Sequence, residues 1–226
     1  MITGIYFLVN PEYEPDRHAS ICNIIDSEKL PNVTLFTHLW GCDITPEMRK
    51  EHVKSDTSMR YHGRNMIHNP LSNGEISLFL NHIECLRSIR STHRDGTFIL
   101  FESDVLIYSN FWENLEQVLA LGESVDWDII NIGEGNGNDV PKSEPIRPYL
   151  HLYKEERNRC TEGIVWSYKG ICKFLEYYEE TLDIDCPFDT KMDVLSEVYG
   201  KFNIYWSHPP LVYQGSVRRI FPSYLR

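Results

Sequence analysis

Apolar segments of strand length alternate with amphipathic segments of helix length along most of the chain. Residues 2–9 and 97–101 are short apolar runs, which predict buried strands. Between them, residues 72–92 repeat apolar side chains every three or four positions, which predicts a helix. Ser72 and Glu75 have the spacing of a capping box at its start. This alternation predicts an α/β layered fold with a mixed, mostly parallel central sheet.

The rest of the chain continues the pattern. Further strands are expected at residues 33–37, 105–108, 127–132, 163–167 and 202–206, and further helices at residues 16–27, 110–121, 168–180 and 188–199. Residues 41–70 show no clear period and predict a loop-rich stretch with a short helix near Pro46. Residues 133–148 are rich in glycine and proline and are long enough for a functional lid. With no repeat, the length favours one domain over residues 1–226.

Composition excludes several classes of protein. The formal net charge is -11 and no basic face is visible, so nucleic acid is not an expected partner. No segment approaches the ~18 apolar residues that a transmembrane helix needs. The six cysteines form no CxxC pair, which predicts free, mostly buried thiols in a reducing compartment. The apolar start is too short for a secretory signal, so we expect a cytoplasmic protein.

Two carboxylates lie directly after the strand expected at residues 97–101. Glu102 and Asp104 are two positions apart, and ligands bind beyond the carboxyl ends of strands in sheets of this kind. Oxygen ligands suit Mg²⁺ or Mn²⁺, and such an ion binds a diphosphate. An acidic protein that binds an anionic ligand needs local positive charge, such as a metal ion or a few placed cations. The alternative interpretation of this short pattern is a polar turn.

Several segments in order along the chain carry a wider pattern. They are Leu71-Ser72-Asn73-Gly74-Glu75-Ile76, Asn81-His82-Ile83, Ile99 to Val105, Tyr6 to Asn10 with Arg17, Trp127 to Ile130, Asp185-x-Pro187-x-Asp189, and Leu211 to Gln214. Together they resemble glycosyltransferase family 25, which includes bacterial lipooligosaccharide galactosyltransferases and collagen galactosyltransferases. Two positions depart from the family pattern: Ser103 stands where the family usually has Asp, and Asn81 where it has Ser.

The resemblance implies a GT-A-like, Rossmann-type fold and an inverting, manganese- or magnesium-dependent transfer of a hexose. The implied donor is UDP-galactose or UDP-glucose, and the implied acceptor is a hydroxyl on a glycan, as in lipopolysaccharide biosynthesis, or on a glycoprotein. The implied metal ligands are Glu102 and Asp104, with His208 as a candidate third ligand. The candidate donor-binding residues are Asn10, Arg17, Arg64, Glu75, His82, Ser103 and Gln214.

Inversion needs one general base for the acceptor hydroxyl. Asp189 is the first candidate because it lies in the matching family segment at an expected helix start, and Glu162 and Glu134 are alternatives. Structural roles stay open for several of these residues: a helix cap for Asp189, a cap and buried hydrogen bond for Glu75 and His82, and a loop role for His208.

Two other functions stay open. One is a catalytically inactive relic of the same fold that binds carbohydrate or nucleotide sugar, which Ser103 would permit. The other is a nucleotidyl transferase, but residues 10–17 do not supply the glycine-rich, basic loop that it would need.

Overall fold

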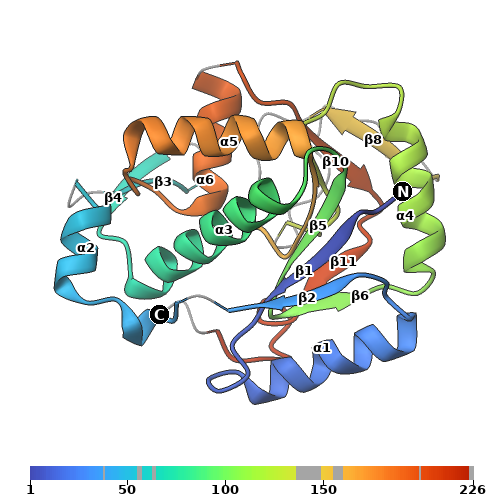
Figure 1. Cartoon of the computed structure of the whole chain (residues 1–226), viewed down its shortest axis with the longest axis horizontal. Coiled ribbons are helices and arrows are strands. Elements are labelled where there is room, and N and C mark those ends of the chain that lie inside the picture. Colours follow the sequence, from blue (N-terminus) through green and yellow to red (C-terminus); the bar gives the residue numbers. More distant parts are fainter. Residues whose placement is uncertain are drawn as a thin grey trace.

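The computed structural model describes residues 1–37, 39–54, 58–62, 65–135, 149–154, 160–198 and 200–223. Its centre is a seven-stranded sheet (Figure 1). In spatial order the strands are β2 (Val33–Phe36), β1 (Gly4–Leu8), β5 (Thr97–Glu102), β9 (Gly163–Ser167), β7 (Ile129–Asn131), β10 (Ile204–His208) and β8 (His151–Lys154). Two strand pairs accompany it, β6 (Val105–Ile107) with β11 (Val212–Gln214) and β3 (Ser58–His62) with β4 (Asn65–Asn69).

The helices flank the sheet. They are α1 (Pro15–Glu28), α2 (Pro46–His52), α3 (Asn73–Thr92), α4 (Phe111–Gly122), α5 (Tyr168–Thr181) and α6 (Phe188–Asp193), with a 3-10 turn η1 (Gly41–Asp43) and a π-helical turn η2 (Val194–Val198). None of the helices in the described ranges is both long enough and apolar enough to cross a bilayer.

Strand directions confirm the predicted sheet. β2 and β5 run parallel to β1, and β10 runs parallel to β7. β9 is antiparallel to both β5 and β7, so these two strands share one direction. β8 is antiparallel to β10. Among the described strands of the seven-stranded sheet, only β8 and β9 therefore run opposite to the other five. The sheet is mixed and mostly parallel.

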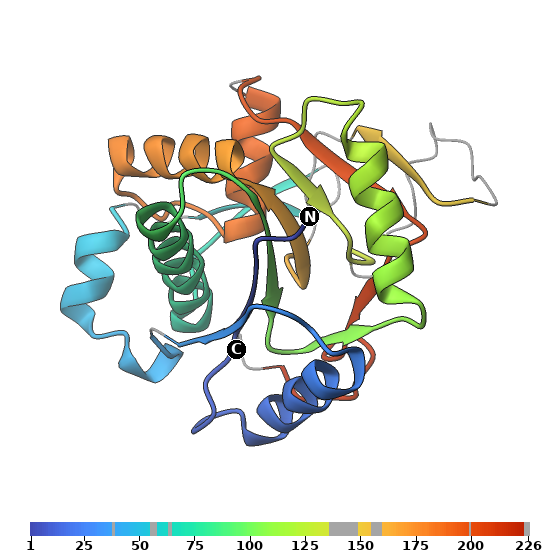
Figure 2. The same ribbon diagram turned by 45° about the vertical axis from the view of Figure 1, so that its right-hand side comes forward.

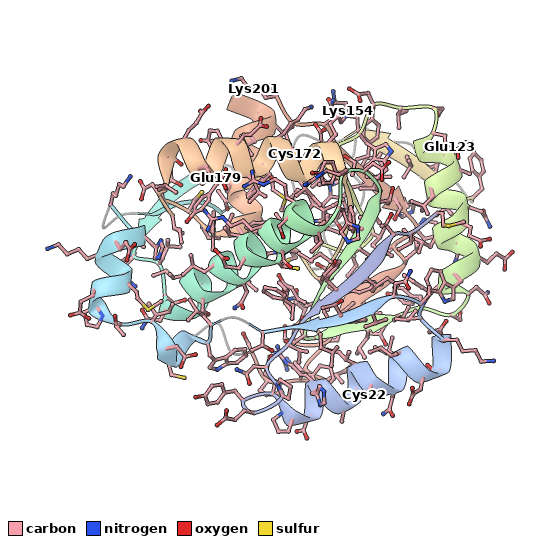
Figure 3. All side chains as sticks on the ribbon, viewed as in Figure 1. Cys22, Glu123, Lys154, Cys172, Glu179 and Lys201 are labelled. Carbon is pink, nitrogen blue, oxygen red and sulfur yellow. The ribbon has the colours of Figure 1, made fainter. Side chains whose placement is uncertain are left out.

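Each face of the sheet buries its own hydrophobic core. Successive side chains of a strand point to opposite faces, so Leu100 joins one core and Ile99 the other. Helices α3, α5 and α6 cover the first face, and α1 and α4 cover the second (Figures 1 and 2). Charged side chains such as Glu123, Lys154 and Lys201 lie on the outside of these layers (Figure 3).

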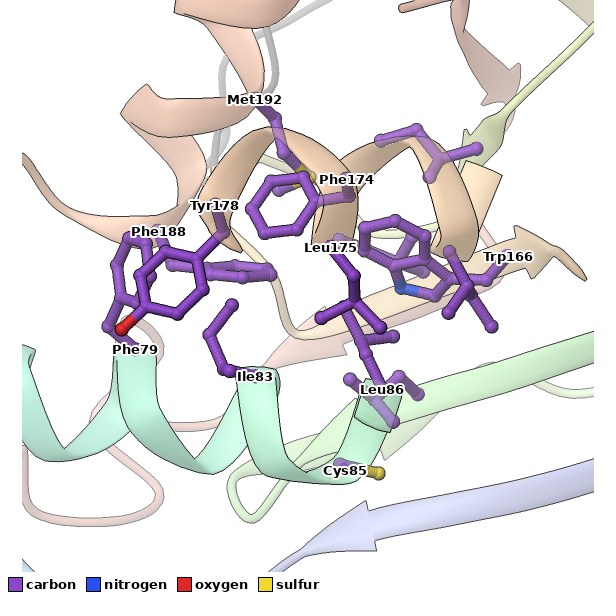
Figure 4. Close-up of a cluster of buried hydrophobic side chains, with 14 of the residues drawn as sticks. Phe79, Ile83, Cys85, Leu86, Trp166, Phe174, Leu175, Tyr178, Phe188 and Met192 are labelled. Atoms are coloured by element: carbon purple, nitrogen blue, oxygen red, sulfur yellow. The ribbon is translucent and has the colours of Figure 1, made fainter. Parts of the chain in front are cut away.

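The first core is strongly aromatic (Figure 4). Phe79 of α3 contacts Phe188 of α6 edge to face, with ring centroids 5.3 Å apart. Phe188 in turn lies 5.0 Å from the ring of Phe174 on α5. Because large aromatic rings bury much apolar area, this cluster fixes α6 against α3 and the sheet. The residue after Phe188 is Asp189, so the same packing positions a candidate site residue.

The expected strands and helices are largely present, with boundaries shifted by a few residues. The sequence prediction missed β8, β11 and the β3–β4 hairpin, and it extended α6 too far, because that helix gives way to η2 after Asp193.

All six cysteines are free thiols, but only Cys85 and Cys186 are buried, so the prediction of mostly buried thiols was wrong. Of the suspected lid, residues 136–148 lie outside the described residues.

The carboxyl ends of β1, β2 and β5 meet at one edge of the sheet, because these neighbouring strands are parallel. The chain leaves β5 through Ser103 and Asp104 and returns in β6, which pairs with β11. The Gly215 amide donates to the Asp104 carbonyl over 2.8 Å. A side chain at position 215 would come within 2.9 Å of that carbonyl, so glycine is needed there. This contact joins the C-terminal segment to the sheet edge.

The capping box of α3 gives a test of the fold. The Ser72 Oγ accepts from the Glu75 amide over 3.2 Å, and Glu75 Oε2 accepts from the Ser72 amide over 2.8 Å. Ser72→Ala should lower the free energy of unfolding by about 1 kcal/mol, measured by urea denaturation. Ser91→Ala, in the exposed last turn of the same helix, is the matched control. Equal losses in the two variants would contradict a specific role for the cap.

Candidate functional site

A cavity opens beyond the carboxyl ends of β1, β2 and β5, with about 670 Å³ of space including the part open to solvent. Six of the residues predicted for the site line it: Asn10, Arg17, Glu102, Ser103, Asp104 and Gln214. The position agrees with the expectation that a ligand site lies at the end of an α/β sheet.

Glu102 and Asp104 face this same cavity, although they are only 8% and 3% exposed. Thr161 Oγ1 donates to Glu102 Oε1, and His82 Nε2 lies 3.6 Å from the same oxygen. Asp104 Oδ2 accepts from the Ser216 amide over 3.3 Å. Asp104 Oδ1 is buried and has no hydrogen-bond partner among the described residues. An unpartnered buried carboxylate oxygen is costly, so this atom is suited to binding a ligand.

The two carboxylates repel each other. Burial, and then the charge of Glu102, raise the pKa of Asp104. A cation between them would remove both penalties. Two carboxylates are what Mg²⁺ takes from a protein when substrate phosphates and water complete its shell. The chemistry of this donor set therefore fits a hard divalent ion.

Ser103 belongs to a buried network with Arg17 and Glu14. Arg17 Nη1 donates to Glu14 Oε1 and to Ser103 Oγ, both over 2.8 Å. Ser103 Oγ donates to Glu14 Oε1 over 2.6 Å. Glu14 thus supplies a carboxylate beside the position where the family usually has Asp. The sequence analysis missed Glu14, although its spacing of three residues from Arg17 at a helix start is a signal for contact.

Arg17 is also held by the C-terminal segment. Its Nη2 donates to the Pro222 carbonyl, and its guanidinium lies 5.8 Å from the centroid of the Phe221 ring. Ser223 reaches the cavity wall. Arg17, one of the candidate donor-binding residues, is therefore held in place by a residue 205 positions away in the sequence.

His82 and Glu75 lie outside the cavity wall. His82 is fully buried behind Glu102, and its ring stacks on Phe188 with centroids 4.0 Å apart. Neither ring nitrogen of His82 has a hydrogen-bond partner within the described ranges. Glu75 forms the α3 capping box, which is the structural role that the sequence left open. The structure therefore does not favour direct contact of His82 or Glu75 with a donor in this cavity.

Glu162 and Asp189 form a second acidic group near the cavity. Glu162 Oε1 accepts from the Gly135 amide over 3.1 Å, and burial raises the pKa of Glu162 to about 8. A Cβ at Gly133 would lie 2.4 Å from the Glu162 carboxyl carbon, so glycine makes room for this side chain. Asp189 is half-buried in the first turn of α6, not at its N-cap, which is Pro187. Burial raises the pKa of Asp189.

Neither residue lines the cavity, but both lie close to it. Burial, followed by the charges of Glu162, Asp189, Glu102 and Asp104, raises the pKa of the Cys160 thiol. All four carboxylates therefore lie close enough to Cys160 for their charges to act on its thiol. Asp189 Oδ2 accepts from the Cys160 amide over 3.3 Å. The alternative base Glu134 is bound instead in an ion pair with Arg218, whose Nη2 lies 2.6 Å from its Oε2.

His208 is not brought to the two carboxylates. It ends β10, which is separated from β5 by β9 and β7, and its ring packs on that of His151 with centroids 5.5 Å apart. Within the described part of the chain, no group of three His, Cys, Asp or Glu side chains could hold a metal ion. The expectation of His208 as third ligand beside Glu102 and Asp104 is therefore not supported. Arg64 lies outside the described residues.

No protein-family model matches the chain, and a search of curated proteins found no match. The resemblance to glycosyltransferase family 25 therefore depends on the motifs alone.

The raised pKa of Glu162 predicts a pH dependence of stability. An unfolded glutamate loses its proton near pH 4.5, whereas the native state keeps it to about pH 8. Stability should therefore fall as the pH rises through this window, by up to about 1.4 kcal/mol per pH unit from this group. Glu162→Gln should remove that part of the slope in urea denaturation between pH 5 and 7.5 with EDTA. The exposed Glu116→Gln on α4 is the control, and parallel slopes for wild type and Glu162→Gln would refute the prediction.

Proposed function

We propose that the protein is an inverting, metal-dependent glycosyltransferase that moves galactose or glucose from a UDP-sugar to a hydroxyl group of a glycan or glycoprotein. One observation carries the proposal: Glu102 and Asp104 border one cavity at the sheet edge, and a buried oxygen of Asp104 has no partner among the described residues. The ordered motifs add the class of reaction.

Glu102 and Asp104 would hold Mn²⁺ or Mg²⁺, which supplies positive charge for the diphosphate as it departs. Thr161 fixes one oxygen of Glu102. Arg17 adds a guanidinium at the cavity wall, although Glu14 balances its charge. Among the described residues, the cavity wall thus contributes a pair of anionic side chains and one guanidinium whose charge is balanced, so the donor's phosphates would need the metal.

The transfer forms a bond from the acceptor oxygen to the anomeric carbon and breaks the bond from that carbon to the diphosphate. The acceptor proton passes to a carboxylate, and UDP leaves. Asp189 is the better base of the two candidates, because it is half-buried while Glu162 is fully buried.

The metal pair gives the first test. Glu102→Gln and Asp104→Asn should each weaken Mn²⁺ binding at least about tenfold, because each removes one anionic ligand. Binding is measured by electron paramagnetic resonance of free Mn²⁺, and release of UDP from UDP-galactose and UDP-glucose is measured with and without the metal. Glu12→Gln, on an exposed part of the same loop as Asn10, is the matched control. Unchanged Mn²⁺ affinity in both site variants would sink the proposal.

The same assay separates an enzyme from an inactive relic. Wild-type protein that binds Mn²⁺ and UDP-sugar yet releases no UDP with any hydroxyl acceptor would be a binding protein of the same fold.

The choice of base gives the second test. Asp189→Asn should lower turnover about 100-fold or more and leave the Kd for UDP within about twofold of wild type, because a base acts on the acceptor and not on the nucleotide. Single-turnover kinetics and calorimetry measure the two quantities. Glu162→Gln is the comparison variant, because Glu162 is the other candidate base. A large loss in Glu162→Gln with little loss in Asp189→Asn would transfer the role to Glu162.

A further inference from the structure

An aromatic pair stands at the cavity, on loops that follow adjacent strands. Trp40 comes after β2 and lines the cavity, and Tyr13 comes after β1. Their rings are stacked, with centroids 5.8 Å apart and planes at 19°. Tyr13 is 41% exposed, so this pair is not part of either hydrophobic core. An aromatic stack that large at the edge of a cavity needs a reason other than core packing.

Side-chain hydrogen bonds hold the backbone of both loops. Asn81 donates from Nδ2 to the Leu39 carbonyl over 2.6 Å and accepts at Oδ1 from the Leu39 amide over 3.2 Å, which fixes the residue before Trp40. The Trp40 amide donates to Asp43 Oδ2 over 2.7 Å. On the other loop, Asn10 Oδ1 accepts from the Tyr13 amide over 3.2 Å. Loops whose backbone is held in this way lose less freedom when a ligand stacks on their side chains.

The loop carrying Trp40 is also packed tightly on the start of α3. A Cβ at Gly41 would lie 3.3 Å from the Gly74 Cα, and both glycines line the cavity. The cavity is therefore bordered by an aromatic ring and two glycines as well as by Glu102 and Asp104. A ligand that fills it presents a flat, apolar group to the first set and an anionic group, through a cation, to the second.

We propose that Trp40, supported by Tyr13, is the surface on which the base of a nucleoside diphosphate stacks, while the diphosphate lies toward Glu102 and Asp104. This inference rests on the proposed function and adds to it the part of the site that recognises the nucleoside. Asn81, which departs from the family pattern, becomes the positioning residue for the Trp40 loop.

The test compares ligands with and without a base. Calorimetry in Mn²⁺ measures the Kd of wild type and variants for UDP, ADP and inorganic pyrophosphate. Trp40→Ala should weaken UDP binding about tenfold, the size of effect seen when a stacking ring is removed, and change pyrophosphate binding less than twofold. Trp40→Phe should restore most of the UDP affinity, and Tyr13→Ala should give a smaller loss than Trp40→Ala. Tyr149→Ala, at an exposed ring outside the cavity wall, is the control.

The outcomes distinguish the two levels of the proposal. Retained pyrophosphate binding in Trp40→Ala shows that the cavity is still folded, so a selective loss of UDP supports the stacking surface. If Trp40→Ala weakens UDP binding and pyrophosphate binding alike, the base does not lie on Trp40 and the inference is overturned. The same holds if UDP binding is unchanged while the KM of a glycan acceptor rises. If wild type binds neither ligand with Mn²⁺, the proposed function itself fails.

Discussion

The structure of the site depends on one electrostatic constraint, the burial of Glu102 and Asp104 side by side at the edge of the sheet. Glu14 adds a third carboxylate, and Arg17 forms an ion pair with Glu14. Buried like charges cost stability unless a cation compensates them. The excess of negative charge makes the cavity a poor site for a free anion and a suitable one for an anion that arrives with a divalent metal.

The fold produces this arrangement by joining distant segments at one edge. Parallel pairing of β1 and β5 places Asn10 and Glu102 at the same end of the sheet. Antiparallel pairing of β11 with β6 sets Gln214 opposite Val105, so the C-terminal segment completes the cavity wall. The two hydrophobic cores hold these strands from both faces. Packing thus fixes the backbone, and the backbone fixes where the carboxylates lie.

The two departures from the family pattern have structural counterparts. Ser103 cannot contribute a charge, but its hydroxyl bonds the carboxylate of Glu14, which an aspartate at the same position would repel. Asn81 bonds both the amide and the carbonyl of Leu39, a double contact that serine is too short to make with both groups. In each case a neighbouring residue and the substituted side chain form one hydrogen-bonded unit.

Local sequence patterns determined the secondary structure of α3, β5 and β9 and the capping box at Ser72. They also placed Glu102 and Asp104 just after a buried strand. Periodicity and capping depend on residues close in the chain, so the sequence alone is enough to predict them. The order of the strands is set by long-range packing, and only the tertiary structure decided it. That order joined Glu14 to Ser103 across 89 residues and brought Gln214 to the cavity. It also left His208 beside His151, with two strands between it and the two candidate metal ligands that the sequence had grouped with it.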